Sequence, residues 1–306
     1  MTLVASPKQQ TMPAPPPASA PMRGIVHFIG AGPGDPELLT LKAQRLIAQA
    51  DTIIYAGSLV NPAVLAHARA GAELHDSAHL KLEEQVEIMR AAVARGEMVA
   101  RLQTGDPSLY GAIAEQMREL RRMGIPYAIV PGVSSAFAAA AALGVELTVP
   151  ESTQTAIFCR LAGRTPVPSR ESLRDLAAHR CSLVVFLSAG MVYGVVEELR
   201  AAGYAEDTPV AIVQRASWPD EMVLRGTLAD IVAQAQAAEI THQALIVVSP
   251  ALSWGLAGEP GARSHLYGQA LAMPQREDSI AIVALSRQGT LTGLALQRAL
   301  DSSVLS

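Results

Sequence analysis

The stretch IVHFIGAGPGDP, residues 25–36, decides the fold. A short apolar run meets a turn that holds three glycines and two prolines, and a helical pattern starts at about Glu37. A strand, a glycine-rich turn and a helix in this order bring the backbone of an α/β domain close to a ligand. The sequence therefore predicts an α/β fold with a ligand site beside this turn.

A dinucleotide site is the first alternative, and the spacing fits it badly. The pattern G-x-G-x-x-G requires a glycine at position 35, where Asp35 stands, and Pro33 lacks an N–H that would cradle a pyrophosphate. The acidic residue expected after the second strand, Asp51, precedes that strand instead. An NAD-dependent oxidoreductase is thus the weaker hypothesis, because a cationic or neutral ligand suits Asp35 better than an anionic one.

The composition excludes several classes of protein. The 306 residues are enough for about two domains, half of them are apolar, and the net charge of −4 shows no basic footprint of nucleic-acid binding. The two cysteines, Cys159 and Cys181, form no CxxC or zinc-ligand spacing. No apolar run reaches the length of a membrane span. We expect no structural metal, no nucleic acid and no membrane as partners.

The N-terminal residues 1–23 are rich in Pro, Ala, Ser and Gln and lack a charged segment followed by an apolar core. This composition predicts a disordered tail and not a signal peptide, so we expect a cytoplasmic protein.

Two consecutive α/β patterns follow the tail. Five short strands alternate with helices between about residues 25 and 130, which predicts a mostly parallel sheet. The second pattern contains strands near 155–159, 182–187, 210–213 and 244–248, and an added strand at 222–225 suggests some antiparallel pairing. We therefore expect an N-terminal α/β domain over 24–135 and a C-terminal α/β domain over 136–252. The cleft between them is the expected ligand site.

Polar residues after the predicted strands admit two interpretations each. Asp106 stands between a glycine and a proline, where it either faces a ligand or stabilises an Asx turn. Ser134 and Ser135 follow Pro-Gly and suit a helix N-cap, a role that still leaves a hydroxyl or N–H for a ligand. His75 and His79 have the spacing of a metal pair on a helix, but no third ligand is evident.

Three arginines follow strand ends in the second pattern. They are Arg160, Arg164 and Arg215. One such residue alone favours a solvated surface, whereas three around one expected cleft make recognition of carboxylates an equally good interpretation.

Three motifs together carry a resemblance to a known family. GAGPGDP (30–36), TGDP (104–107) and PGVSS (131–135) resemble the tetrapyrrole methylases, which use S-adenosylmethionine. Three further stretches resemble the branch of that family that methylates carbon 11 of precorrin-4 or cobalt-precorrin-4. They are YAGSLVNP (55–62), GRTPVP (163–168) and RASWPDE (215–221).

The resemblance implies a homodimer of two-domain α/β chains, with S-adenosylmethionine in the inter-domain cleft and a tetrapyrrole as substrate. A cationic sulfonium suits a turn with a carboxylate and few N–H donors, and a substrate with many carboxylates accounts for the arginines. Carried over by motif, the residues implied to bind the cofactor are Pro33, Thr104, Gly105, Asp106, Leu109, Ser134, Ser135, Leu187 and Ala216.

The reaction implied is methyl transfer to a ring carbon, for which alignment and desolvation matter more than a strong base. No catalytic residue follows from the sequence. Two alternatives stay open: a tetrapyrrole methyltransferase acting on another ring carbon, and a non-catalytic tetrapyrrole-binding protein.

The last part of the chain, residues 253–306, reads as an appendage, because one strand and one helix cannot form a core. The stretch IAIVALSRQG (280–289) resembles the opening of the cobalt-precorrin-5A hydrolase family. We expect the start of a hydrolase-like segment there.

Overall fold

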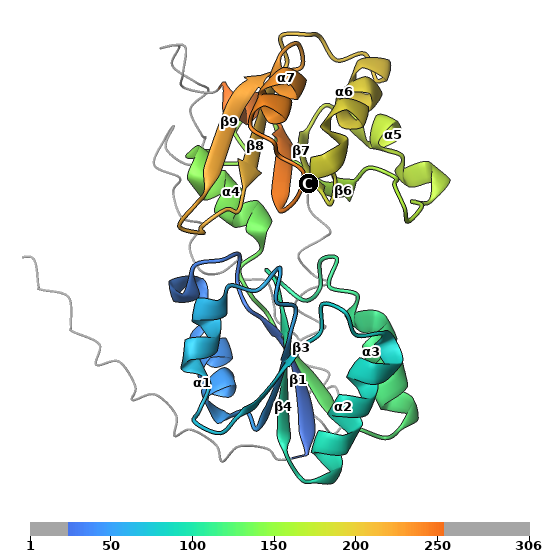
Figure 1. The fold of residues 1–306 in the computed structure, drawn as a ribbon. Coiled ribbons are helices and arrows are strands. Elements are labelled where there is room, and N and C mark those ends of the chain that lie inside the picture. The colour runs from blue at the N-terminus through green and yellow to red at the C-terminus, as the bar shows by residue number, and fades with distance from the viewer. Residues whose placement is uncertain (1–23, 254–306) are drawn as a thin grey trace, which may run out of the picture. The chain divides into compact units, whose positions relative to one another are not determined.

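The computed structural model describes residues 24–253, and the predicted tail and the predicted appendage lie outside them. Two five-stranded sheets, each covered by helices, make up this part of the chain (Figure 1). The fold is of the two-domain α/β kind that the sequence predicts.

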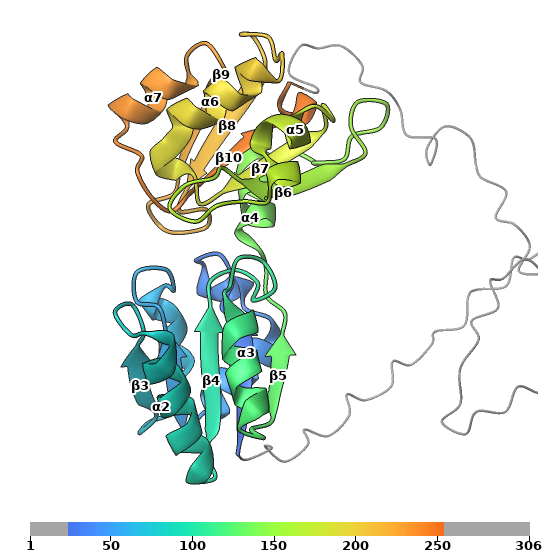
Figure 2. The same cartoon turned by 90° about the vertical axis from the view of Figure 1, so that its right-hand side faces the viewer.

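The first sheet is parallel throughout, as expected, and has the strand order β3-β2-β4-β1-β5. Its strands are β1 (Ile25–Gly30), β2 (Thr52–Tyr55), β3 (Glu73–Asp76), β4 (Met98–Gln103) and β5 (Tyr127–Val130). Helix α1 (Leu41–Gln49) covers one face, and α2 (Leu82–Ala94) and α3 (Ile113–Arg122) cover the other (Figures 1 and 2).

The helix expected to start at about Glu37 begins later than predicted. A single 3₁₀ turn, η1 (Pro36–Leu38), comes first, and its N-cap Asp35 accepts a hydrogen bond from the N–H of Glu37. Helix α1 then starts after Thr40, whose hydroxyl accepts from the N–H of Ala43 at 3.1 Å. A second 3₁₀ segment, η2 (Pro62–His67), follows β2, and its N-cap Asn61 accepts a hydrogen bond from the N–H of Ala63.

The helical pairing of His75 and His79, for which the sequence offered no third ligand, does not form. His75 lies in β3, and His79 lies in the turn after it, so the helical face that would bring them together does not exist. Within residues 24–253, no three His, Cys, Asp or Glu side chains gather as a metal site would require.

The second sheet mixes both strand directions and has the order β6-β7-β10-β8-β9. Its strands are β6 (Ala156–Arg160), β7 (Ser182–Phe186), β8 (Pro209–Gln214), β9 (Met222–Thr227) and β10 (Ala244–Val248). The pair β6–β7 is parallel, whereas β10 runs antiparallel to β7 and β8, and β9 antiparallel to β8. The antiparallel pairing expected from the strand at 222–225 is therefore present.

Helices cover both faces of the second sheet too. Helices α5 (Leu173–Ala177), α6 (Val192–Ala201) and α7 (Ile231–Ala237) share one apolar cluster with it, and the alanine-rich α4 (Ser135–Leu143) packs on the opposite face. Because β5 ends the first sheet at Val130 and α4 joins the core of the second, we propose that the two domains divide at residues 135/136.

Three glycines bring three loops of the first domain into backbone contact. Gly30 ends β1, and Gly105 and Gly132 follow β4 and β5; a Cβ built on Gly132 would lie 2.7 Å from the Cα of Gly30 and closer still to the carbonyl oxygen of Gly105. The N–H of Gly105 also donates to the carbonyl of Gly32 at 2.7 Å. Only residues without a side chain permit this approach.

We expect Gly132→Ala to destabilise the protein by about 3 kcal/mol, because the added methyl group meets backbone atoms that cannot move aside. Chemical denaturation followed by circular dichroism measures the loss. The matched control is Gly163→Ala, whose Cβ would meet only the flexible end of Met191 at 3.2 Å. That control should change stability by less than about 0.5 kcal/mol. Equal effects for both variants would contradict the steric argument.

Candidate functional site

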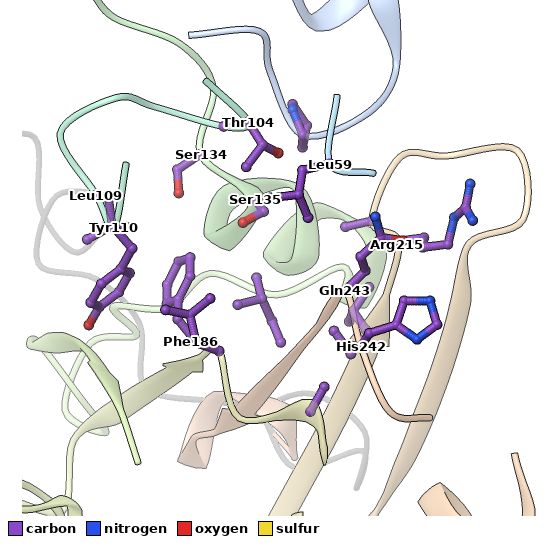
Figure 3. A pocket seen from close by; sticks show the side chains of 18 of the residues that line it. Leu59, Thr104, Leu109, Tyr110, Ser134, Ser135, Phe186, Arg215, His242 and Gln243 are labelled. Atoms are coloured by element: carbon purple, nitrogen blue, oxygen red, sulfur yellow. The ribbon is translucent and has the colours of Figure 1, made fainter. Parts of the chain in front are cut away.

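A cavity of about 390 Å³ lies where the strand-end loops of the first sheet meet those of the second (Figure 3). The first sheet supplies the turns after β1 and β4 and the start of α4. The second supplies the ends of β7 and β8 and the start of β10. Most of the wall is apolar, including Leu59, Leu109, Phe186, Leu187 and Val213. This volume and this lining are typical of a small-molecule site.

The strand order explains the position of the cavity. The chain leaves β1 toward β2 on one side and leaves β4 toward β5 on the other, so β1 and β4 are neighbours at the point where the connections diverge. Ligands of open parallel sheets bind at such a point, beyond the carboxyl ends of the strands. Residues of the turns after β1 and β4 line the cavity here, among them Pro33 and Thr104.

All nine residues expected to bind the cofactor line this one cavity. They are Pro33, Thr104, Gly105, Asp106, Leu109, Ser134, Ser135, Leu187 and Ala216. Arg215 lines it as well. The structure thus brings together residues that are up to 183 positions apart in sequence, and their roles toward a cofactor stay a prediction.

Asp106 organises the floor of the cavity. Its Oδ1 accepts hydrogen bonds from the backbone N–H and the hydroxyl of Ser108, and its Oδ2 accepts from the N–H of Gly132 at 2.9 Å. The Asx-turn interpretation is therefore correct, and it is compatible with a ligand role because the same residue faces the cavity. Burial raises the pKa of Asp106, but the three hydrogen bonds outweigh burial and lower it overall.

Ser134 and Ser135 also combine a structural role with access to the cavity. Ser134 is the N-cap of α4, and its hydroxyl accepts from the N–H of Ala136 at 3.3 Å. Ser135 is the first residue of that helix, and both serines line the cavity. The helix-cap interpretation is therefore correct for Ser134, and the ligand role of both serines stays a prediction.

Gln103 is a lining residue that sequence reasoning missed. It is the last residue of β4, only 8% exposed, and its side-chain Nε2 has no hydrogen-bond partner among the described residues. A buried donor without a partner is costly, and a ligand in the cavity would supply one. No sequence pattern singles out this residue, because a glutamine at a strand end is ordinary.

Strained backbone is concentrated around the cavity. Of the nine non-glycine residues at positive φ within residues 24–253, four line it: Tyr110, Leu187, Arg215 and Gln243. Two more, Ala112 and Ser217, lie one or two positions from lining residues. Such conformations cost of order 1–3 kcal/mol each and gather at functional sites. The conformations that cost folding free energy are therefore concentrated around the cavity, as is typical of a functional site.

A loop bridge, formed by residues 33–35 and 58 with residues 217–218 and 243, joins the two sheets on one side of the cavity. The indole Nε1 of Trp218 donates to the carbonyl of Pro33 at 2.9 Å, and the N–H of Asp35 donates to the hydroxyl of Ser217 at 3.0 Å. Gln243 donates to the carbonyl of Ser58. Gly34 has to be a glycine because a Cβ there would overlap the Trp218 ring. These contacts explain why the chain carries both motifs, 30–36 and 215–221.

The three predicted substrate arginines occupy different places. Arg215 stacks on the Trp218 ring with its Cζ 4.2 Å from the ring centroid, and its Nε lies 2.9 Å from Asp220. Arg160 donates to the carbonyls of Thr165 and Pro166, at 2.8 and 2.6 Å. Arg164 is exposed in the same loop, and neither it nor Arg160 lines the cavity. Their contact with a substrate stays a prediction.

None of the helices within residues 24–253 combines the length and the apolar character that a bilayer-spanning helix needs.

Comparison with known proteins adds to this geometry. A family model described as "Tetrapyrrole (Corrin/Porphyrin) Methylases" matches residues 26–232, about two thirds of the chain. The chain belongs to the tetrapyrrole methylase family. The matched segment contains the first sheet except Ile25, and the second sheet except its central strand β10.

Relatives of this tetrapyrrole methylase include two at 52% identity. One, from Methanocaldococcus jannaschii, is named cobalt-precorrin-4 C(11)-methyltransferase; the match covers 74% of this chain and 88% of that protein. The other, from Pseudomonas aeruginosa, is named precorrin-4 C(11)-methyltransferase; the match covers 79% and 94%.

Solved structures show the same fold. An X-ray structure of a cobalt-precorrin-4 methyltransferase matches with a TM-score of 0.73 and 48% identity, over 75% of this chain and 96% of that one. A uroporphyrin-III C-methyltransferase from Thermus thermophilus, crystallised with S-adenosylhomocysteine, matches with a TM-score of 0.63 and 32% identity, over 74% and 92%.

The tetrapyrrole methylase should lose cofactor affinity when the Asp106 carboxylate is removed. Asp106→Ala leaves the N–H groups of Ser108 and Gly132 without acceptors and frees the loop, so we expect S-adenosylhomocysteine to bind at least about 10-fold more weakly in calorimetric titration. The control is Asp230→Ala, which removes a similar acceptor for the N–H of Thr227 far from the cavity. Unchanged affinity in a folded Asp106→Ala protein would refute the assignment.

The charge of Asp106 should also make stability depend on pH. Its pKa is lower in the folded protein than the ordinary 3.8, so the stabilisation is complete above that value and is lost as the pH falls through the folded pKa. We expect the difference in unfolding free energy between wild type and Asp106→Asn to be constant above about pH 5 and to shrink toward zero below pH 4. Denaturation curves at several pH values measure it, and a difference that grows on acidification would contradict the prediction.

Proposed function

We propose that this tetrapyrrole methylase transfers a methyl group from S-adenosylmethionine to carbon 11 of precorrin-4 or cobalt-precorrin-4, giving the precorrin-5 skeleton in cobalamin biosynthesis. The observation that carries the proposal is the 52% identity, over about three quarters of the chain, to proteins named for this reaction. The cavity supports the proposal. Its lining includes residues of the three family motifs, at 30–36, 104–107 and 131–135, and of the stretch 215–221 that resembles the precorrin-4 methyltransferases.

The residues present fit S-adenosylmethionine. The group would supply a methyl on a positively charged sulfur. The cavity floor offers the Asp106 carboxylate, which no Lys or Arg among the described residues neutralises, and it offers the unpaired donor of Gln103. A negative charge without a counter-ion and a mostly apolar wall suit a cation with an extended organic body.

The contribution of the protein to catalysis would be orientation and exclusion of water. Asp106 and its hydrogen bonds hold the floor loop in one conformation, and Leu109, Leu187 and Ala216 form a wall that keeps water out. Bringing two reactants into line in a dry site lowers the barrier of a displacement reaction without a catalytic side chain. We assign no catalytic base.

The polyanionic substrate would be recognised by arginine. Arg160, Arg164 and Arg215 are the proposed carboxylate-binding residues, since guanidinium groups pair with carboxylates in a bidentate manner. The proposal also includes a homodimer and a cytoplasmic location, as expected from the sequence. Light scattering of the purified protein tests whether it is a dimer.

We expect methyl transfer from labelled S-adenosylmethionine to metal-free precorrin-4 or to cobalt-precorrin-4, assayed separately with the methylated position read by NMR. A label at C11 supports the proposal, and the reactive form shows whether the natural substrate carries cobalt. A label at another carbon makes the chain a different tetrapyrrole C-methyltransferase. Binding of both ligands without transfer makes it a tetrapyrrole-binding protein.

A further inference from the structure

Tyr110 lies at the cavity in a conformation that its side chain disfavours. Its φ is 57°, in the left-handed region, and its side chain is 41% exposed. The loop forces this conformation: Gly111 folds back so closely that a Cβ there would overlap the carbonyl oxygen of Pro107. A glycine or an asparagine would relieve the strain at position 110. A bulky aromatic residue in such a strained conformation indicates that its ring has a functional role.

Rigid aromatic neighbours support the Tyr110 ring from behind. Its centroid lies 5.2 Å from that of Phe186, the last residue of β7, at an interplanar angle of 47°. Phe186 in turn meets Phe158 of β6 edge to face at 6.2 Å, and Phe158 meets Phe137 of α4 at 6.1 Å. Because two sheet strands and a helix carry these rings, Tyr110 presents a fixed flat surface to the cavity.

The charge near Tyr110 favours an anionic partner over the cofactor. Burial raises the pKa of Tyr110, the positive charge of Arg160 opposes that rise, and the negative charge of Glu171 adds to it. Arg160 donates to two backbone carbonyls and forms no ion pair with a carboxylate of residues 24–253. Its guanidinium group is therefore available to attract the carboxylates of a macrocycle, whereas it repels a sulfonium cation.

The opposite side of the cavity is already occupied by protein contacts. Figure 3 shows Tyr110 on one side of the cavity and Arg215, His242 and Gln243 on the other. The loop bridge closes that second side, and the charge of Arg215 is paired with Asp220 there. The side beside Tyr110 is therefore where a large macrocyclic substrate would have access.

We propose that the ring of Tyr110, supported by Phe186, is a stacking surface for a pyrrole ring of the substrate, and so sets the position of the macrocycle in the cavity. The inference rests on the proposed function and extends it to a residue of the substrate side. Stacking requires the aromatic ring and not the hydroxyl group.

The test compares Tyr110→Phe and Tyr110→Leu with Tyr193→Leu, which replaces a tyrosine of α6 that is 62% exposed and does not line the cavity. Binding of precorrin-4 without methyl donor is followed by its absorption spectrum, and binding of S-adenosylhomocysteine by calorimetry. We expect Tyr110→Leu to weaken macrocycle binding roughly 3- to 10-fold, the range measured for aromatic pairs. Tyr110→Phe and Tyr193→Leu should stay within about 2-fold of wild type. Affinity for S-adenosylhomocysteine should not change, which also shows that each variant is folded.

Three outcomes overturn the inference. If Tyr110→Leu binds the macrocycle as tightly as wild type, the ring does not contact the macrocycle. If Tyr110→Phe and Tyr110→Leu lose equal affinity, the effect belongs to the hydroxyl group. If affinity for S-adenosylhomocysteine falls in parallel, the ring lies against the cofactor. The proposed function fails separately, when wild type binds the macrocycle and transfers no methyl group to C11. Wild-type protein that does not bind the macrocycle at all overturns both.

Discussion

The backbone contact among Gly30, Gly105 and Gly132 is the constraint on which the site depends. Three strand-end loops approach so closely that Gly30 and Gly132 have no room for a Cβ, and Gly105 adopts a φ of +64° that side chains disfavour. The approach lets the N–H of Gly132 reach the Asp106 carboxylate and lets Gly105 pair with Gly32. One acidic side chain thereby fixes the loops that follow β4 and β5, and the cavity floor takes a single shape before any ligand arrives.

The loop bridge applies a comparable constraint from the second sheet. Trp218 reaches the carbonyl of Pro33 across 185 positions of sequence, and Gly34 provides the space for its indole ring. The strained residues Arg215 and Ser217 belong to the same loop. The strained loop of the second domain is thus also the loop that contacts the turn after β1. Its strain is balanced by hydrogen bonds that neither domain could form alone.

The two walls of the cavity differ in charge and in rigidity, which matches a reaction between a cation and a polyanion. The floor around Asp106 is negative and saturated with internal hydrogen bonds. The side near Tyr110 is aromatic, and its neighbouring cation, Arg160, is positioned by carbonyls and not by an acid. In the function proposed above, such a division would favour the cationic cofactor on the Asp106 side and the polyanionic substrate on the Tyr110 side.

The sequence by itself determined the fold class, the parallel first sheet and the antiparallel pairing in the second, because periodicity and glycine-proline turns are local signals. The nine residues that share the cavity were expected from the resemblance to the tetrapyrrole methylases, since their motifs could be matched one by one along the sequence. Local signals did not reveal the start of α1 after a 3₁₀ turn, nor the extended conformation of His75, which β2 imposes by pairing. Strand order was equally hidden, since any order is compatible with the same alternation. Only the tertiary structure decided that Gln103, Tyr110 and Trp218 face the cavity, because burial, strain and contact across 185 positions depend on how the two sheets are brought together.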